Sequence, residues 1–188
     1  GNRIQAEKVT FRIGKLPFFY LPKVAHPIDR RLVELGGQIG FRDNLGAFVQ
    51  SETLLPFIYS WRLGMNLDAY SKRGILFGPA ASMQKGGSEK GVVSRLEAGF
   101  IRDTGDRGFD LLGNPIEEDR WLVAFRHRQI INPRLSIAAA IDAWSDSEVL
   151  RDFRSELFRS NQNPDNYVEA TYREGGIFVS AITRLAPN

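Results

Sequence analysis

The side chains that could do chemistry are few and far apart. The 188 residues include two histidines, His26 and His127, and no cysteine. A zinc site or a Cys–His pair needs several such ligands together, so metal binding and nucleophilic catalysis are poorly supported. The carboxylates Glu117, Glu118 and Asp119 are adjacent, but they stand in a polar stretch that predicts a solvated loop. We therefore expect no catalytic residue, no metal and no cofactor, and we expect that the protein is not an enzyme.

A glycine-rich segment, GGSEKG at residues 86–91, could cradle a phosphate if it joined a strand to a helix. Strand-like sequence stands on both sides of it, so it predicts a turn. The formal net charge is +3, and Lys and Arg are scattered among Asp and Glu. Without a block of like charge, we expect no nucleic-acid partner.

The composition indicates a folded chain, because hydrophobic residues make up 43% and charged residues 25%. No stretch approaches the roughly 20 apolar residues of a membrane helix. No signal peptide is visible. The chain begins inside a strand-like segment, so we expect it to be a piece of a longer protein.

Alternation with a period of two runs along the chain and predicts β-strands. It is clearest at 55–69, 92–101, 120–128, 135–144 and 168–181. Residues 55–69 fit one long strand or two strands with a tight turn near Ser60 to Arg62. One side of the pattern is apolar, and we expect it to face lipid: Trp61, Leu63, Met65, Trp121, Val123, Phe125, Ile137 and Ile141. The other side is small or charged, and we expect its charged residues to face a lumen: Arg62, Arg95, Arg126, Arg128 and Asp142.

Short turns are predicted at 43–44, 72–74, 86–91 and 132–133, and long polar connections at 103–119 and 145–166. Residues 148–159 could form one or two helical turns. Short turns combined with long loops are typical of outer-membrane barrels, although the turns at 43–44 and 72–74 would fall on the side of the long loops. Soluble sandwiches, jelly rolls and lipocalin-like barrels also contain alternating strands. The long strands and the mixed polar faces favour the membrane alternative.

Residues 16–31 carry prolines at regular intervals of five: Pro17, Pro22 and Pro27. Proline cannot donate to a strand ladder and is confined to edges, strand starts and bulges. The segment therefore predicts a boundary at which one sheet ends and another begins. An ordinary proline-rich edge strand has the same features.

The same segment resembles the junction between jelly roll and barrel in the lipopolysaccharide-assembly protein family LptD, also called OstA. Pro17 to Pro22, Pro27 and the run Asp29–Arg30–Arg31 follow the order of that family. Further similarities follow in the same order: LLPFIYSW at 54–61, Lys72–Arg73–Gly74, Asp119–Arg120–Trp121–Leu122 with His127, and Ser145–Asp146 followed by Asp152–Phe153. Together they cover residues 9–183. The chain departs from the family at Gly36–Gly37, where the family usually has a proline.

The resemblance implies an all-β fold, an antiparallel up-and-down meander forming part of a transmembrane β-barrel. A short N-terminal piece would belong to a periplasmic β jelly roll. Residues 1–28 would be the end of the jelly-roll domain and a linker, and residues 29–188 the N-terminal strands of the barrel. The residues of the junction would be Pro17, Pro22, Pro27, Asp29, Arg30 and Arg31.

The resemblance also implies a function, the transport and assembly of lipopolysaccharide into the outer leaflet of the cell outer membrane, through a barrel with a lateral exit. Its partners would be lipopolysaccharide, outer-membrane lipid, a plug lipoprotein of the LptE type and a periplasmic bridge protein of the LptA type. The alternatives are a soluble β-sandwich that binds carbohydrate or a protein partner, and an unrelated outer-membrane porin.

A lateral exit requires a seam that is weaker than the rest of the ladder. Unpaired strand groups in lipid cost several kcal/mol each, so a barrel normally stays shut. Glycine and proline loosen or remove ladder bonds. The candidates for a lateral gate are Gly36, Gly37 and Pro56. The simpler interpretation is that these residues mark a strand start and a bulge and have no role in transport.

Overall fold

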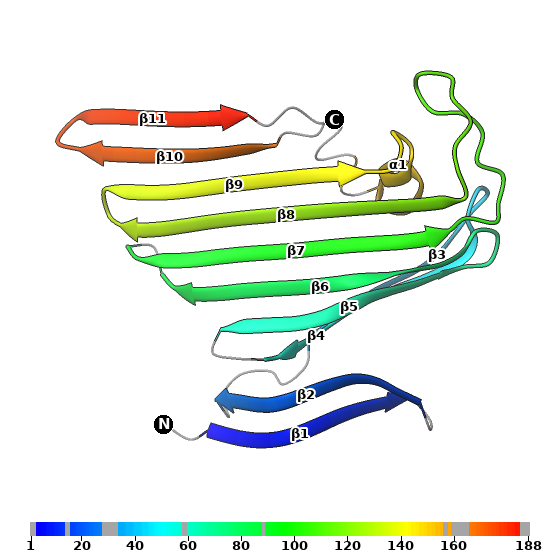
Figure 1. Ribbon diagram of the computed structural model, residues 1–188, viewed down its shortest axis with the longest axis horizontal. Coiled ribbons are helices and arrows are strands. Elements are labelled where there is room, and N and C mark those ends of the chain that lie inside the picture. Colours follow the sequence, from blue (N-terminus) through cyan, green and yellow to red (C-terminus); the bar gives the residue numbers. More distant parts are fainter. Residues whose placement is uncertain are drawn as a thin grey trace.

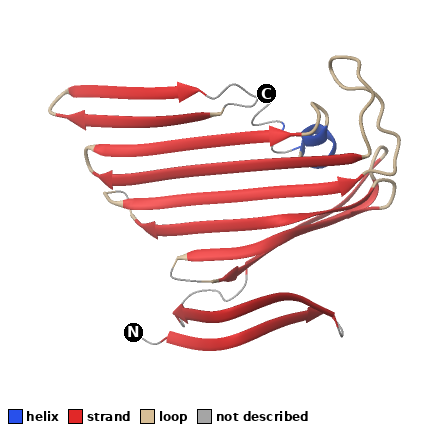
Figure 2. Cartoon of the chain, in the orientation of Figure 1, coloured by secondary structure: helices blue, strands red, loops and turns tan. Residues whose placement is uncertain are grey.

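The computed structural model describes residues 3–13, 16–27, 34–57, 60–87, 89–155, 158 and 166–184. These residues form two antiparallel sheets and a short helix (Figures 1 and 2). The small sheet pairs β1 (Arg3–Ile13) with β2 (Leu16–Pro27). The strands of the large sheet are β3 (Glu34–Arg42), β4 (Gly46–Pro56), β5 (Trp61–Tyr70), β6 (Gly74–Gly86), β7 (Gly91–Arg102), β8 (Asp119–Asn132), β9 (Leu135–Trp144), β10 (Tyr167–Glu174) and β11 (Ile177–Arg184). The helix α1 (Val149–Phe153) lies between β9 and β10.

The large sheet is a simple meander, in which every strand pairs with its neighbours in the sequence. This confirms the predicted all-β antiparallel up-and-down meander. The sheet is open: β3 and β11 lie at its two ends, and each pairs on one side only within the described residues. Closure into a barrel and the jelly roll remain predictions. No helix among the described residues is long and apolar enough to cross a bilayer.

Local turn chemistry explains where the strands reverse. After β8, the side chain of Asn132 accepts hydrogen bonds from the backbone N–H groups of Arg134 (2.8 Å) and Leu135 (2.9 Å), which closes the turn. Between β10 and β11, Gly175 and Gly176 both have positive φ, as a two-residue hairpin turn requires. The loop after β7 and the connection after β9 lie at the opposite ends of the strands from these turns (Figure 1). We call that end of the sheet the loop rim.

The structure answers two questions about secondary structure that the sequence leaves open. Residues 55–69 form parts of two strands, because β4 ends at Pro56 and β5 begins at Trp61. The expected helical turn within 148–159 is confirmed as α1, although it is only five residues long.

The proline-rich segment lies in a sheet of its own, as its spacing predicted. The described residues of this part, 8–13 and 16–22, pair within the β1–β2 sheet, apart from the sheet that contains 92–144. The pairing skips Pro22, and Lys8 in the opposite strand has a φ of 58°, unusual for a residue other than glycine. The register is the same on both sides of this gap; it shifts instead between Phe11 and Arg12, beside Pro17, where the ladder is irregular. The division into domains at residue 28 stays a prediction.

The large sheet is strongly coiled around β4 to β7. Strands β4 and β6 are separated by β5 yet contact each other, and so do β5 and β7. A Cβ atom at Gly64 would lie 1.6 Å from the backbone oxygen of Thr53, and one at Gly78 would lie 2.2 Å from that of Ala98. The absence of a side chain at these two positions therefore allows neighbouring backbones to approach closely, as glycine kinks do in curved sheets.

We expect Gly64→Ala to lower the free energy of unfolding by about 1–3 kcal/mol, because the new methyl group meets backbone that cannot rotate away. Gly36→Ala is the matched control, since nothing lies within 4 Å of its Cβ position. The control should be neutral or slightly stabilising. Urea unfolding of the full-length protein measures both effects, and equal midpoints for the two variants would contradict a close approach at Gly64.

A compact core lies near the loop rim, where α1 packs on one face of the large sheet. Val149, Leu150 and Phe153 of the helix are buried. They pack in one cluster with residues from six strands and turns of the sheet: Leu45, Phe48, Tyr70, Leu76, Ile101 and Leu122. Burial of this apolar surface holds a helix that is too short to be stable alone.

Candidate functional site

The register of the large sheet divides its side chains between two faces. Residues directly opposite each other in paired strands share a face, and this places Arg62 (β5), Ser82 (β6), Arg95 (β7) and Arg126 (β8) in one row. Trp61, Met83, Ser94 and His127 form the neighbouring row on the other side. Arg128 and Asp142 belong to the face of Arg62. The structure therefore puts all five predicted lumen-facing residues on one face; whether that face lines a lumen stays a prediction.

The opposite face is apolar and uncovered. Its exposed side chains include a row of large hydrophobic residues from five strands: Leu67, Ile75, Phe77, Phe100, Trp121 and Ile141. Phe77 and Phe100 contact each other edge to face across the strands. In a soluble β-sandwich this face would pack on a second sheet, and no second sheet covers it among the described residues. An exposed apolar surface of this extent marks contact with lipid or with another protein.

The polar face is concave over β3 to β7, and its charges are paired. Arg95 on β7 reaches Glu52 on β4 with an N–O distance of 2.6 Å, which spans two intervening strands. Arg62 pairs with Glu34 at 3.0 Å. Further pairs join Arg126 to Asp142 at 2.7 Å, and Arg154 to Asp68 and to Glu97. Alternating charges in this arrangement make a polar surface with little net charge.

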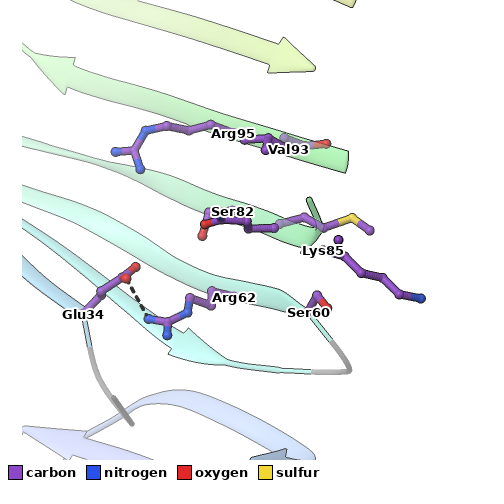
Figure 3. A pocket seen from close by; sticks show the side chains of 11 residues that line it. Glu34, Ser60, Arg62, Ser82, Lys85, Val93 and Arg95 are labelled. Atoms are coloured by element: carbon purple, nitrogen blue, oxygen red, sulfur yellow. Dashed lines mark ion pairs between the residues drawn. The ribbon is translucent and has the colours of Figure 1, made fainter. Parts of the chain in front are cut away.

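Two hollows lie side by side on this concave face and share Arg95. The larger, of about 560 Å³, is lined by side chains that include Glu34, Arg62, Ser82 and Lys85 (Figure 3). The second, of about 270 Å³, lies nearer the loop rim and is lined by Gln38, Gln50, Glu52, Asn66, Asp68 and Arg154, among others. Amides, hydroxyls and paired charges can hydrogen-bond to a hydrated ligand in many orientations. They offer no nucleophile with an adjacent base.

A cluster of largely buried charges lies at the loop rim. The side chain of Arg120 at the start of β8 is fully buried, and its guanidinium donates to three carboxylates. These are Asp103 (2.9 Å), Asp146 (2.7 Å) and Asp152 (2.8 Å). Arg73 also donates to Asp103 and to Asp152. We call Arg73, Asp103, Arg120, Asp146 and Asp152 the rim cluster.

Each charged side chain of the rim cluster is paired with an opposite charge within the cluster. Burial opposes the charge on Asp103, but hydrogen bonds from Arg73 and Arg120 outweigh burial and hold the pKa of that carboxyl below its usual value. The ring of Phe153 lies beneath both guanidinium groups, 5.4 Å from Arg73 and 5.1 Å from Arg120. The cluster therefore ties the loop after β7 and the α1 segment to the edge of the sheet.

Sequence reasoning did not identify the rim cluster as a site, yet four of its five members belong to motifs noted above. Arg73 comes from the Lys72–Arg73–Gly74 turn, Arg120 from the DRWL run, and the two others are Asp146 and Asp152. These motifs indicated turns and strand starts one at a time. The signal that could have linked them is the recurrence of a charged residue at each strand end on the same rim.

The predicted gate residues lie in the edge strand β3 and in its neighbour β4. Gly36 and Gly37 are in the edge strand β3, opposite Glu52 and Ser51 of β4. Pro56 is the last residue of β4. This confirms the expected arrangement, in which the strand with the two glycines is an edge strand and pairs with the strand that contains Pro56.

The position of Pro56 shows which side of β4 lacks a donor. The next residue, Phe57, donates its N–H to the oxygen of Trp61 at 2.9 Å, toward β5. Backbone groups alternate sides along a strand, so the nitrogen of Pro56 faces the β3 side. The predicted residues of the junction are described only in part. Pro17, Pro22 and Pro27 lie within β2, whereas Asp29, Arg30 and Arg31 lie outside the described residues.

A meander of long strands with one apolar face and one charged face is the arrangement found in transmembrane β-sheet proteins. A search of known protein families finds none that matches the chain. The chain is similar to the LPS-assembly protein LptD of Ectopseudomonas mendocina (strain ymp), with 28% identity over 159 residues. The match covers 81% of this chain and 16% of that protein, so the chain spans a small part of its relative's length.

Proposed function

We propose that this chain is part of a protein that assembles lipopolysaccharide in the cell outer membrane. In this proposal the apolar face of the large sheet meets membrane lipid, and the concave polar face guides the hydrated sugar portion of the lipopolysaccharide. The single observation that carries the proposal is the separation of apolar from charged residues between the two faces, in register across the strands from β4 to β9. The similarity to LptD supports the choice of cargo.

The pairing of charges suits a surface along which a cargo moves. Guanidinium groups that already bind carboxylates, such as Arg95 with Glu52 and Arg126 with Asp142, attract a passing anion less than free ones would. The surface can still exchange hydrogen bonds with sugar hydroxyls, directly or through water. Such a surface stays hydrated and binds the cargo only weakly.

A photo-crosslinking residue at position 82 tests this function. Ser82 lines the larger hollow, whereas its neighbour Ala81 lies on the apolar face. In living cells, irradiation should join lipopolysaccharide to the protein with the crosslinker at 82. The crosslinker at 81 is the matched control and should yield mainly adducts with other lipids.

Immunoblots against lipopolysaccharide distinguish the outcomes. An adduct at position 82 alone supports the proposal. Absence of an adduct at 82, in a protein that reaches the outer membrane, would point to an unrelated porin. Equal adducts at both positions would mean that the two faces do not separate sugar from lipid.

We extend the proposal to partners and to the exit of the lipid. The partners are a plug lipoprotein of the LptE type and a periplasmic bridge protein of the LptA type, and the exit lies beside β3. What supports the exit is the free edge of β3 within the described residues, together with the missing donor of Pro56, which lies two residues beyond Leu54, the last described partner of β3 in β4. Open edges in lipid are unfavourable unless another strand covers them. A seam with fewer ladder bonds would therefore open most easily.

Replacing Pro56 with alanine restores a donor on the β3 side of β4. We expect this change to strengthen the β3–β4 pairing and to slow the appearance of lipopolysaccharide at the cell surface. The measurement is the labelling of surface lipopolysaccharide in cells with equal amounts of wild-type and variant protein. Pro79→Ala is a control, because Pro79 lies in β6, remote from the free edge. Unchanged export in Pro56→Ala would leave Pro56 as a strand-end residue without a gating role.

A further inference from the structure

A third hollow on the polar face differs from the first two in its charge. It has a volume of about 210 Å³ and lies at the end of the strands opposite the loop rim. Its lining includes three arginines from three different elements: Arg128 of β8, Arg134 of the β8–β9 turn and Arg173 of β10. The hydroxyl-bearing residues Ser136 and Thr171, directly opposite each other on β9 and β10, also line it.

The arginines of this hollow are less neutralised than those elsewhere on the polar face. Arg134 forms an ion pair with Glu174 at 2.8 Å. Neither Arg128 nor Arg173 forms an ion pair with a carboxylate among the described residues; Arg173 lies over the ring of Phe178 instead. Glu169, the next acidic residue on this face of β10, accepts a hydrogen bond from Ser180 at 2.6 Å. The hydroxyl of Thr171 donates to the same carboxylate at 3.5 Å, so Glu169 also lies beside the hollow. Three guanidinium groups thus border the hollow against two carboxylates, Glu169 and Glu174, both of which already have partners.

The backbone fixes two of these arginines relative to each other. The N–H of Arg173 donates to the carbonyl oxygen of Arg134 at 2.7 Å, which joins the β8–β9 turn to β10. The side chain of Asn132 closes the same turn. Arg128 rises from the adjacent strand of one rigid ladder. The backbone positions that carry the three arginines are therefore held within one antiparallel ladder, from which their exposed side chains reach the hollow.

We propose that this hollow binds a phosphate group. Guanidinium groups match phosphate oxygens with two parallel hydrogen bonds, and hydroxyls can supply further donors. The small volume fits a single phosphate with the first part of the molecule that carries it better than an extended acidic peptide. The identity of that molecule rests on the proposed function, which would supply phosphorylated sugars; phosphate recognition itself depends only on the hollow.

Titration calorimetry on the full-length protein in detergent tests the proposal with defined probes. Glucose 6-phosphate should bind and glucose should not. Arg128→Gln should weaken the binding of glucose 6-phosphate about tenfold, because a charge-assisted hydrogen bond is lost. Arg102→Gln is the matched control: it removes the same charge from an exposed side chain at the loop rim and should leave the affinity unchanged. Arg173→Gln repeats the test from β10.

Further probes distinguish the sources of the phosphate. Inorganic phosphate binding as tightly as glucose 6-phosphate would support a site for free phosphate, and tighter binding of glucose 6-phosphate would support a sugar-linked one. Preferential binding of phosphatidylglycerol vesicles that Arg128→Gln abolishes would assign the phosphate to a lipid headgroup. Failure of all phosphate probes, equal loss in Arg102→Gln, or stronger binding of hexaglutamate would overturn the proposal. None of these results depends on lipopolysaccharide export, so the crosslinking test stands apart from them.

Discussion

Replacing Arg120 with methionine should destabilise the protein by about 3–5 kcal/mol, because it leaves buried carboxylates without their shared cation. Asp103, Asp146 and Asp152 all accept hydrogen bonds from this guanidinium, and Arg73 reaches only two of them. Methionine keeps an unbranched apolar stem but lacks the guanidinium group, so the loss is mainly that of the charge and its hydrogen bonds. Urea unfolding of the full-length protein gives the magnitude. Hydrogen exchange of the amides in α1 should rise as well, because Asp152 belongs to that helix.

The control for this prediction is Arg102→Met. Arg102 forms an exposed ion pair with Glu118 at the same rim, and exposed pairs contribute at most about 1 kcal/mol. A small effect of Arg102→Met beside a large effect of Arg120→Met would establish that burial gives the rim cluster its energy. If the two variants unfolded alike, the cluster would not hold the loops to the sheet.

Placing an arginine on the apolar face should have the second large effect. Ala81 lies near the middle of β6 on that face, and Arg at the midplane of a transmembrane strand costs about 2–4 kcal/mol. Ala81→Arg should therefore lower the free energy of unfolding in lipid vesicles by this amount. The cause is the transfer of a charge into hydrocarbon, where it has no partner.

Ser82→Arg is the matched control, one residue away on the opposite face. Its side chain would enter the larger hollow, where Arg62 pairs with Glu34, and where Arg95 pairs with Glu52 of the adjoining hollow. The new charge stays in contact with water there, so the effect should be below about 1 kcal/mol. Similar small effects at both positions would mean that the apolar face does not lie in lipid. This comparison tests the membrane location without any assay of transport.

The exposed apolar face also gives the soluble alternative little support. A β-sandwich that binds carbohydrate would bury Phe77, Phe100 and Trp121 between two sheets. These side chains are exposed on a single sheet instead. The polar face, by contrast, carries the three polar hollows and the covering helix. The large sheet therefore exposes apolar side chains on a face where a soluble protein would present polar ones to water.

The sequence by itself determined several of the strands, most of their turns and the two faces. Period-two alternation around Trp61 and Arg62 already assigned these residues to opposite sides, because side chains alternate along any strand. The Asn132–Pro133 pair indicated one of the hairpins, since turn chemistry is local. In a meander each strand pairs with its neighbour in the sequence, so local signals also gave the strand order. The spacing of Pro17, Pro22 and Pro27 indicated a separate sheet for the same local reason.

Only the tertiary structure decided which distant residues meet. The rim cluster joins Arg73 to Asp152 across 79 positions, and no periodicity carries that information. The pairing of Arg95 with Glu52, and the hollow around Arg128, depend on how the sheet coils and on which carboxylates its curvature brings within reach. That coiling depends on backbone approach at glycines such as Gly64, which in the sequence resemble any other glycine. Alternation sets the direction of each side chain, whereas curvature and register summed over many strands set its partner.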